Sequence, residues 1–215
     1  MLLWFFRTAG AAFLAALSHE SKPAPAGWEG PGCESLGWGL FGEGSAIRHG
    51  EPYLRRDQQR PYPTRRGLPL GRWFEELKPA ASAQGGILAL SAATARDLLA
   101  TKQELAVLPG DVPHGNILNF GEHGWLAIDP KGLIGERCFD YANLFCNPDH
   151  ETARAPSRLA RQIEVVADAA GLERKRLLRW VLAWAGLSAV WHIGNGAPPD
   201  TALVVAEIAA AQLYL

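Results

Sequence analysis

The chain has 215 residues, which suits one domain or two small lobes and is long enough to bury a hydrophobic core. Hydrophobic residues make up 48% and charged residues 20%, and the formal net charge of -1 gives no basis for binding nucleic acid or an acidic membrane surface. The three cysteines are scattered without CxxC spacing, which argues against a disulfide framework or a zinc site and for a reducing compartment.

The N-terminal stretch MLLWFFRTAGAAFLAALSHES contains an apolar run that could be read as a secretory signal peptide. Arg7 interrupts this run, and no basic region precedes it as a signal peptide would require. The run is also too short and too broken to span a bilayer. We therefore expect an amphipathic or irregular start to a cytoplasmic chain.

Residues 18–64 are rich in Gly and Pro and show no sustained apolar period, which is typical of loop or poorly ordered chain. Regular spacing of apolar residues begins at Leu68. We predict an irregular or degenerate N-terminal segment over 1–64 and a folded unit over 65–215.

Two helices are predicted at the start of the folded unit. The first has four apolar residues at helical spacing: Leu70, Trp73, Phe74 and Leu77. Pro79 is expected to end it. The second is entered after Gly85-Gly86 and carries Ile87, Leu88, Leu98 and Leu99.

Three strands are predicted next. Leu105–Leu108 is a short apolar run that suggests a buried strand. Residues 116–120 and 125–128 then form two strands of a hairpin, joined by the turn Gly-Glu-His-Gly at 121–124.

From Phe139 onward the pattern is helical. One apolar stripe holds Leu159, Ile163 and Val166, with Gly171 as the expected C-cap. Another stripe holds Leu177, Leu178, Val181, Leu182 and Ala185. Thr201 can N-cap a last helix. The predicted fold class is α+β, mainly α, with helices before and after a small β hairpin.

Three polar residues, Asp111, Asn116 and Asp129, lie close together between these short apolar runs. Phosphoryl transfer needs metal ions that hold the phosphates and a carboxylate that orients the attacking hydroxyl. Mg²⁺ prefers hard oxygen ligands and takes few carboxylates from the protein. The hairpin would fold Asp129 back toward Asn116, so the pattern predicts a magnesium and phosphoryl-transfer site.

The spacing from Asp111 to Asn116 matches the kinase catalytic loop D-x-x-x-x-N. That spacing alone is unspecific, and the combination of glycine turns and apolar strands around it strengthens the match. The structural alternative is that Asp111 and Asn116 are turn residues and that Asp129 precedes Pro130 in another turn.

The stretch GDVPHGNILNFGEHGWLAIDPKGLIGERCFDYANLFCNP resembles the aminoglycoside phosphotransferase family, in its streptomycin and hydroxyurea phosphotransferase branch. The resemblance runs from about Leu68 to the C-terminus. It implies the helical C-terminal lobe of a protein-kinase-like fold, with the hairpin at the catalytic cleft. It also implies ATP and Mg²⁺ as cofactors and a small-molecule acceptor.

The resemblance implies Asp111 as catalytic base, and Asn116 and Asp129 as metal ligands that bind the nucleotide through Mg²⁺. Asp140, in FDYAN, resembles the aspartate that braces the catalytic loop through backbone hydrogen bonds. Its alternative role is a plain N-cap.

The sequence departs from the family in its loop. Pro109 and Pro113 stand where the family usually has histidines, and the first of these supports the loop backbone. Proline removes a backbone donor and fixes φ. A kinase also needs a lysine on an apolar strand, and neither Lys22 nor Lys78 fits. The segment GWGLFG at 37–42 matches G-x-G-x-x-G, but no strand with a lysine follows it.

Several other polar or aromatic residues are given structural roles. His114 could face the active cleft and is equally expected to be solvated, and Lys131 could approach a phosphate but is more often simply exposed in such a turn. We expect residues 173–176 to form a solvated helix start. Three tryptophans at helical spacing are expected in the core: Trp180, Trp184 and Trp191.

Two functional hypotheses follow. The first is an ATP- and magnesium-dependent phosphotransferase that acts on a hydroxyl of an aminoglycoside such as streptomycin, or on hydroxyurea, and confers antibiotic resistance. The second is a catalytically inactive, truncated kinase-like lobe with a binding or interaction role only. Neither hypothesis involves nucleic acid or a membrane, and the oligomeric state and the acceptor are not readable from the sequence.

Overall fold

The structure is a computed structural model, which describes residues 67–113, 116–119, 125–127, 131–147 and 149–214. The predicted N-terminal segment 1–64, with Lys22 and GWGLFG, lies outside the described residues. So do His114, the turn at 121–124 and Asp129.

The described chain is mainly helical, with two small sheets, which confirms the predicted α+β, mainly α class. The strands are β1 (Leu68–Pro69), β2 (Leu105–Leu108), β3 (Ile117–Asn119), β4 (Trp125–Ala127) and β5 (Leu133–Glu136). The longer helices are α3 (Leu77–Gln84), α4 (Gly86–Ala100), α7 (Pro156–Ala170), α8 (Arg174–Gly194) and α9 (Asp200–Leu213). The short helical turns are α2 (Gly71–Phe74), α5 (Phe139–Ala142), η6 (Asn143–Cys146) and α6 (His150–Ala153).

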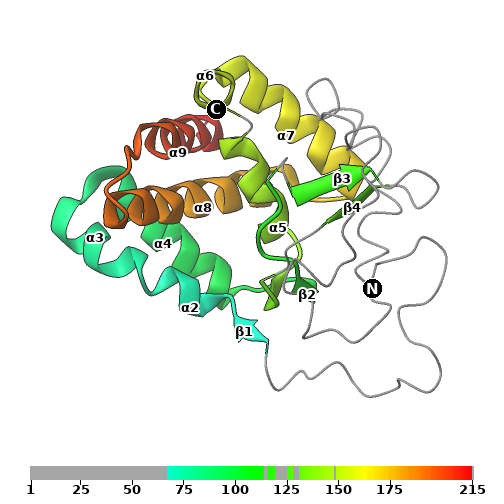
Figure 1. The fold of residues 1–215 in the computed structure, drawn as a ribbon, viewed down its shortest axis with the longest axis horizontal. Helices are drawn as coiled ribbons and strands as arrows, with labels where there is room; N and C mark the ends of the chain where they lie inside the picture. The colour runs from blue at the N-terminus through cyan, green and yellow to red at the C-terminus, as the bar shows by residue number, and fades with distance from the viewer. Residues whose placement is uncertain (1–66, 114–115, 120–124, 128–130, 148, 215) are drawn as a thin grey trace, which may run out of the picture.

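Helix α8 is the centre of the fold. Figure 1 shows it between α4 and α9, with α5 against its N-terminal half. Its apolar residues Leu177, Val181 and Ala185 are completely buried, as their helical stripe predicted. A Cβ at Gly186 would collide with the side chain of Ser91, so small residues allow α4 and α8 to pack closely.

The three-stranded sheet has the order β1-β5-β2, with β5 parallel to β1 and antiparallel to β2. Leu108 pairs with Leu133 across β2 and β5, and both side chains are buried. The prediction of a buried strand at β2 is only half right, because Leu105 at its other end is 58% exposed. Strand β5 was not predicted.

The second sheet is the hairpin of β3 and β4, which pair antiparallel with Ile117 opposite Ala127. Both predicted strands are therefore confirmed over the described residues, with Asn116 outside β3, while Phe120 and Ile128 lie outside the described residues. The loop between β2 and the hairpin contains Asp111 and Asn116.

Two predicted helix boundaries are wrong. The break in the first helical pattern falls at residues 75–76, and Pro79 is the third residue of α3. A proline is tolerated there because an N–H in the first turn has no intrahelical acceptor. Thr201 is not an N-cap, because α9 begins one residue earlier and the Thr201 hydroxyl hydrogen-bonds the ring of His150.

Of two other boundaries, one is a residue off and one is confirmed. Helix α4 includes Gly86 and so begins one residue before the predicted start after Gly85-Gly86. Helix α7 ends at Gly171, whose φ of 62° is left-handed, and the Leu172 N–H closes the turn on the Ala167 carbonyl at 2.8 Å. Among the described residues, no helix is long and apolar enough to cross a membrane.

Candidate active site

The loop that follows β2 is fixed at its start by three contacts. Gly110 has a φ of 85°, and a Cβ there would lie 2.7 Å from Leu133, so the position requires glycine. The Lys131 N–H donates to the Pro109 carbonyl at 2.6 Å. The Gly110 N–H donates to Oδ1 of Asp140 at 2.9 Å. These contacts hold the chain as it enters Asp111.

Asp111 presents a partly exposed carboxylate, with 31% of its side chain accessible. Its Oδ1 accepts a hydrogen bond from Nδ2 of Asn143 at 2.8 Å. Its Oδ2 lies 3.7 Å from Nζ of Lys131. The carboxylate is thus oriented by a neutral donor on one side and faces a cation on the other.

Asn116 lies against the same loop. Its Nδ2 donates to the backbone carbonyl of Asp111 at 3.1 Å, and its own N–H donates to the Pro113 carbonyl at 2.9 Å. The amide nitrogen is therefore used within the loop, and Oδ1 is the atom that Asn116 can offer to a cation. The structure brings two of the three predicted site residues together, while Asp129 lies outside the described residues.

The oxygen donors of this loop are the Asp111 carboxylate and the Asn116 amide oxygen. Oxygens of both kinds are suitable ligands for a hard cation such as Mg²⁺. Within the described ranges, no group of three or more His, Cys, Asp or Glu residues could hold a metal ion. Asparagine is not one of those four residue types, and Asp129 lies outside the described residues.

Asp140 supports the loop from the second position of α5. Its side chain is 2% exposed, and the N-cap of α5 is Cys138, so Asp140 is not an N-cap. The loop-bracing role implied by the family resemblance is present as one backbone hydrogen bond, from Gly110. Its other oxygen, Oδ2, has no hydrogen-bond partner among the described residues.

Among the described residues, Oδ2 of Asp140 lacks a hydrogen-bond donor, and this favours the neutral form of its carboxyl group. Burial raises its pKa from the ordinary value of 3.8 to about 8, the Gly110 N–H opposes this rise, and the charge of Asp111 adds to it. Pro109, next to Gly110, has no N–H to offer. Asp140 is therefore mostly neutral at pH 7.

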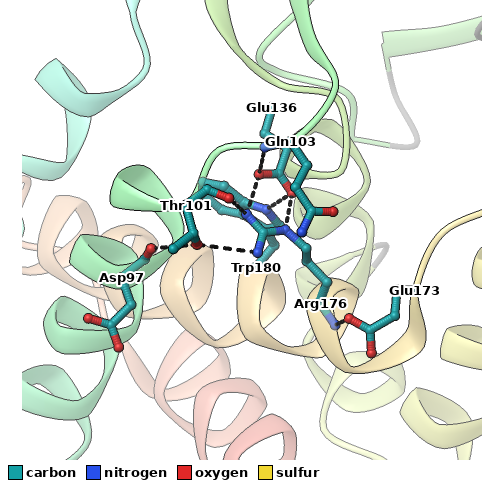
Figure 2. A network of polar contacts seen from close by, with 7 residues as sticks. All are labelled: Asp97, Thr101, Gln103, Glu136, Glu173, Arg176 and Trp180. Carbon is teal, nitrogen blue, oxygen red and sulfur yellow. Dashed lines mark hydrogen bonds and ion pairs between the residues drawn. The ribbon is translucent and has the colours of Figure 1, made fainter.

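A second buried carboxylate, Glu136, lies four residues before Asp140 and has several donors (Figure 2). Arg176 donates to its Oε1 from Nε and to its Oε2 from Nη2, both at 2.6 Å. Trp180 Nε1 donates to Oε1 at 2.8 Å, and the Gln103 N–H donates to Oε2 at 3.0 Å. Arg176 also reaches the Thr101 carbonyl at 2.7 Å.

The prediction of a solvated helix start at 173–176 is confirmed for residues 173–175, which are exposed, and is wrong for Arg176. Arg176 is 8% exposed and faces the interior, while Glu173 caps α8 by accepting from the backbone N–H groups of Lys175 and Arg176. Burial alone would raise the pKa of Glu136, but the hydrogen bonds from Arg176, Trp180 and Gln103 lower it. Glu136 is therefore charged and fixes the segment leading to Asp140 against α8.

This network has only a weak signal in the amino-acid sequence. Arg176 and Trp180 are four residues apart and so share a helix face, but their acceptor comes from a distant strand. The expected core role of the tryptophans is confirmed for Trp180 and Trp184, which are 0% and 5% exposed. Trp191 is half-buried, and its Nε1 donates to Glu76 at 2.8 Å.

The family model described as aminoglycoside/hydroxyurea antibiotic resistance kinase matches residues 52–196. A streptomycin 3''-kinase from Klebsiella pneumoniae is 50% identical over 133 residues, which cover 60% of this chain and 50% of that protein. A hydroxyurea phosphotransferase from Kitasatospora aureofaciens is 29% identical over 121 residues, covering 53% of this chain and 34% of that protein. A streptomycin 6-kinase from Streptomyces griseus is 30% identical over 109 residues, covering 49% of this chain and 34% of that protein.

No solved structure matches the chain. The chain spans half the length of the first of these relatives and about a third of the other two.

Proposed function

The chain belongs to the aminoglycoside/hydroxyurea antibiotic resistance kinase family, and we propose that it transfers the γ-phosphoryl group of ATP to a small-molecule acceptor. A hydroxyl of a streptomycin-like aminoglycoside is the first candidate acceptor, because the most extensive of the three matches described above is with a streptomycin kinase. Hydroxyurea is the second candidate, from the match with its phosphotransferase.

One observation carries the proposal: Asp111 is partly exposed and is held by Asn143 at 2.8 Å in a loop that also positions Asn116. A turn residue needs no such orientation of its carboxylate. A base that meets a substrate hydroxyl needs both access and a fixed direction.

In the proposed reaction, the Asp111 carboxylate accepts a hydrogen bond from the acceptor hydroxyl and directs its oxygen at the γ-phosphorus. The new P–O bond forms as the bond to the ADP oxygen breaks, and Asp111 takes the hydroxyl proton. Asn116 and Asp129 would hold Mg²⁺, which neutralises charge on the phosphates. Lys131, 3.7 Å from the Asp111 carboxylate, adds positive charge beside the loop.

The inactive-lobe alternative also has support. None of the five strands that the structure describes carries a lysine, although a kinase uses one to hold the nucleotide phosphates. Asp140 supports the loop through one hydrogen bond where two oxygens are available. Both observations concern nucleotide binding and loop geometry rather than the acceptor.

The test is phosphate transfer by the full chain, with ATP and Mg²⁺, to streptomycin, other aminoglycosides and hydroxyurea, followed by mass spectrometry. Asp111→Asn preserves the shape of the side chain and removes the base, so the transfer rate should fall by ~10²–10⁴. The Kd for ATP should stay unchanged, because Asp111 meets the acceptor.

Asp168→Asn is the matched control, since this aspartate is exposed on α7 and should leave the rate unchanged. Absence of product from the wild type across the whole panel would favour the inactive lobe. Undiminished transfer by Asp111→Asn would mean that another group is the base.

A further inference from the structure

Asp111 is oriented by a series of hydrogen bonds that connects its loop to η6 and, through Arg158, to α7. Asn143, the first residue of η6, is 8% exposed and donates from Nδ2 to Asp111 Oδ1 at 2.8 Å. Asn147 donates from its own Nδ2 to Asn143 Oδ1 at 3.1 Å and to the Asn143 carbonyl at 2.9 Å. Arg158 of α7 holds the Asn147 carbonyl at 2.8 Å.

These contacts fix which way the Asn143 amide points. Its Oδ1 accepts from Asn147, so its NH₂ group is left to face Asp111. The next two residues of η6, Leu144 and Phe145, are fully buried and hold the turn in place. Asn143 is thus a rigid donor on the interior side of Asp111.

We propose that Asn143 is a positioning residue that holds Oδ1 of Asp111, so that Oδ2 is the oxygen that receives the proton of the acceptor hydroxyl. The inference rests on the proposed phosphotransferase function. Oδ2 faces Lys131 Nζ at 3.7 Å, which is longer than a hydrogen bond. The two oxygens of Asp111 are therefore inequivalent, because Oδ1 accepts from the buried Asn143 and Oδ2 faces Lys131.

The choice of residue at 143 fits this role. A neutral amide orients the carboxylate without cancelling its charge, whereas an arginine or lysine in direct contact would make it a weaker base. An aspartate there would repel Asp111. An apolar residue of the same size would leave Asp111 free to rotate about its side-chain bonds.

The contact itself is tested without any activity, by NMR of the side-chain amide groups in the full chain. The Asn143 Nδ2 signals, assigned by their loss in Asn143→Leu, should shift when Asp111→Ala removes their acceptor. The Nε2 signals of Gln212, which donates to the Pro156 carbonyl, should not move. Unchanged Asn143 signals in Asp111→Ala would overturn the proposal.

The positioning role is tested by kinetics. Asn143→Leu should lower kcat by ~10–100-fold, because a small misplacement of the reacting group has an effect of that order. The KM for ATP should not change, since Asn143 acts through Asp111. Asn143→Asp should lower kcat at least as much, because it places a like charge against the base, and Asn147→Ala should act in the same direction and less strongly.

Gln162→Leu is the matched control: it replaces another buried amide, on α7, that has no hydrogen bond to the Asp111 loop among the described residues. Its kcat should equal that of the wild type. A purely structural role for Asn143 would lower activity only in proportion to the folded fraction, measured by urea unfolding, and would overturn the proposal. If the wild type transfers no phosphate, the proposed function is wrong, and the positioning role of Asn143 in catalysis is wrong with it. The NMR result still tests the contact between Asn143 and Asp111.

Discussion

Glu136 and Asp140 are carboxylates four residues apart, each 2% exposed, yet the structure moves their pKa values in opposite directions. Glu136 accepts four hydrogen bonds, from Arg176, Trp180 and the Gln103 N–H, and its pKa is lowered. Asp140 accepts one, from the Gly110 N–H, and its pKa is raised to about 8.

The difference follows the hydrogen-bond donors: several donors lower the pKa of Glu136 despite its burial, whereas one donor leaves the pKa of Asp140 raised. Both side chains are 2% exposed, and desolvation raises the pKa of each. Only Glu136 has a cation and enough N–H groups to replace the lost water. Glu136 anchors the segment to α8, whereas Asp140 supports the loop that contains Asp111.

The largest expected effect comes from removing the ion pair between Arg176 and Glu136. Arg176→Met leaves Glu136 buried without its cation, and should lower the free energy of unfolding by ~3–5 kcal/mol. Arg179→Met, three residues along the same helix, is the control, because its contact with Asp97 is 3.5 Å long and exposed and should contribute ~0–1 kcal/mol. Urea unfolding measures both, and equal losses would contradict an anchoring role for Glu136.

The pH dependence of stability separates the two carboxylates. The folded pKa of Asp140, about 8, is above its unfolded value, so the folded state binds the extra proton and stability falls as pH rises from about 4 through about 8. Between pH 6 and pH 8 the loss should be about 2 kcal/mol, and Asp140→Asn should remove it.

Glu136 acts in a different window. Its folded pKa is below the ordinary value, so its contribution is present above about pH 4.5 and is lost as pH falls below that. Asp140→Asn should leave this loss of stability at acidic pH unchanged. A wild-type stability that is flat from pH 6 to pH 8 would contradict a neutral Asp140.

The smallest expected effect comes from supplying Asp140 with a second donor. Pro109→Ala places an N–H beside that of Gly110, and a hydrogen bond to Oδ2 should reduce the loss between pH 6 and pH 8 by ~1 kcal/mol. Pro113→Ala, in the same loop, is the control for the entropy that any proline contributes. The two variants are compared by thermal unfolding at both pH values, and an identical response would mean that the new N–H does not reach Asp140.

The parts of the fold that depend on local pattern were predictable. Helices α4 and α7 have regular apolar spacing and glycines at their ends, and the hairpin strands are separated by a glycine turn. Strand β5 was missed because it has four residues and gains its identity from pairing with β1 and β2. Such short strands are set by tertiary contacts that periodicity does not record.

The site was predictable to a similar degree. The spacing of Asp111 and Asn116 pointed to one loop, and the structure joins them there. The contact of Asn143 with Asp111 spans 32 residues, and that of Arg176 with Glu136 spans 40, so no local signal could reveal either. The sequence indicated that Pro109 removes a donor, but only the structure places the unpaired Asp140 Oδ2 beside the loop.

Whether Asp140 supports the Asp111 loop as a neutral carboxyl can be measured directly from the ¹³C NMR signal of its carboxyl carbon, followed against pH in the full chain. The signal should titrate with a midpoint at about 8, while that of Glu136 should titrate below its ordinary value. A midpoint for Asp140 in the ordinary carboxyl range, or below it, would contradict the account, because the loop would then be held by a charged aspartate.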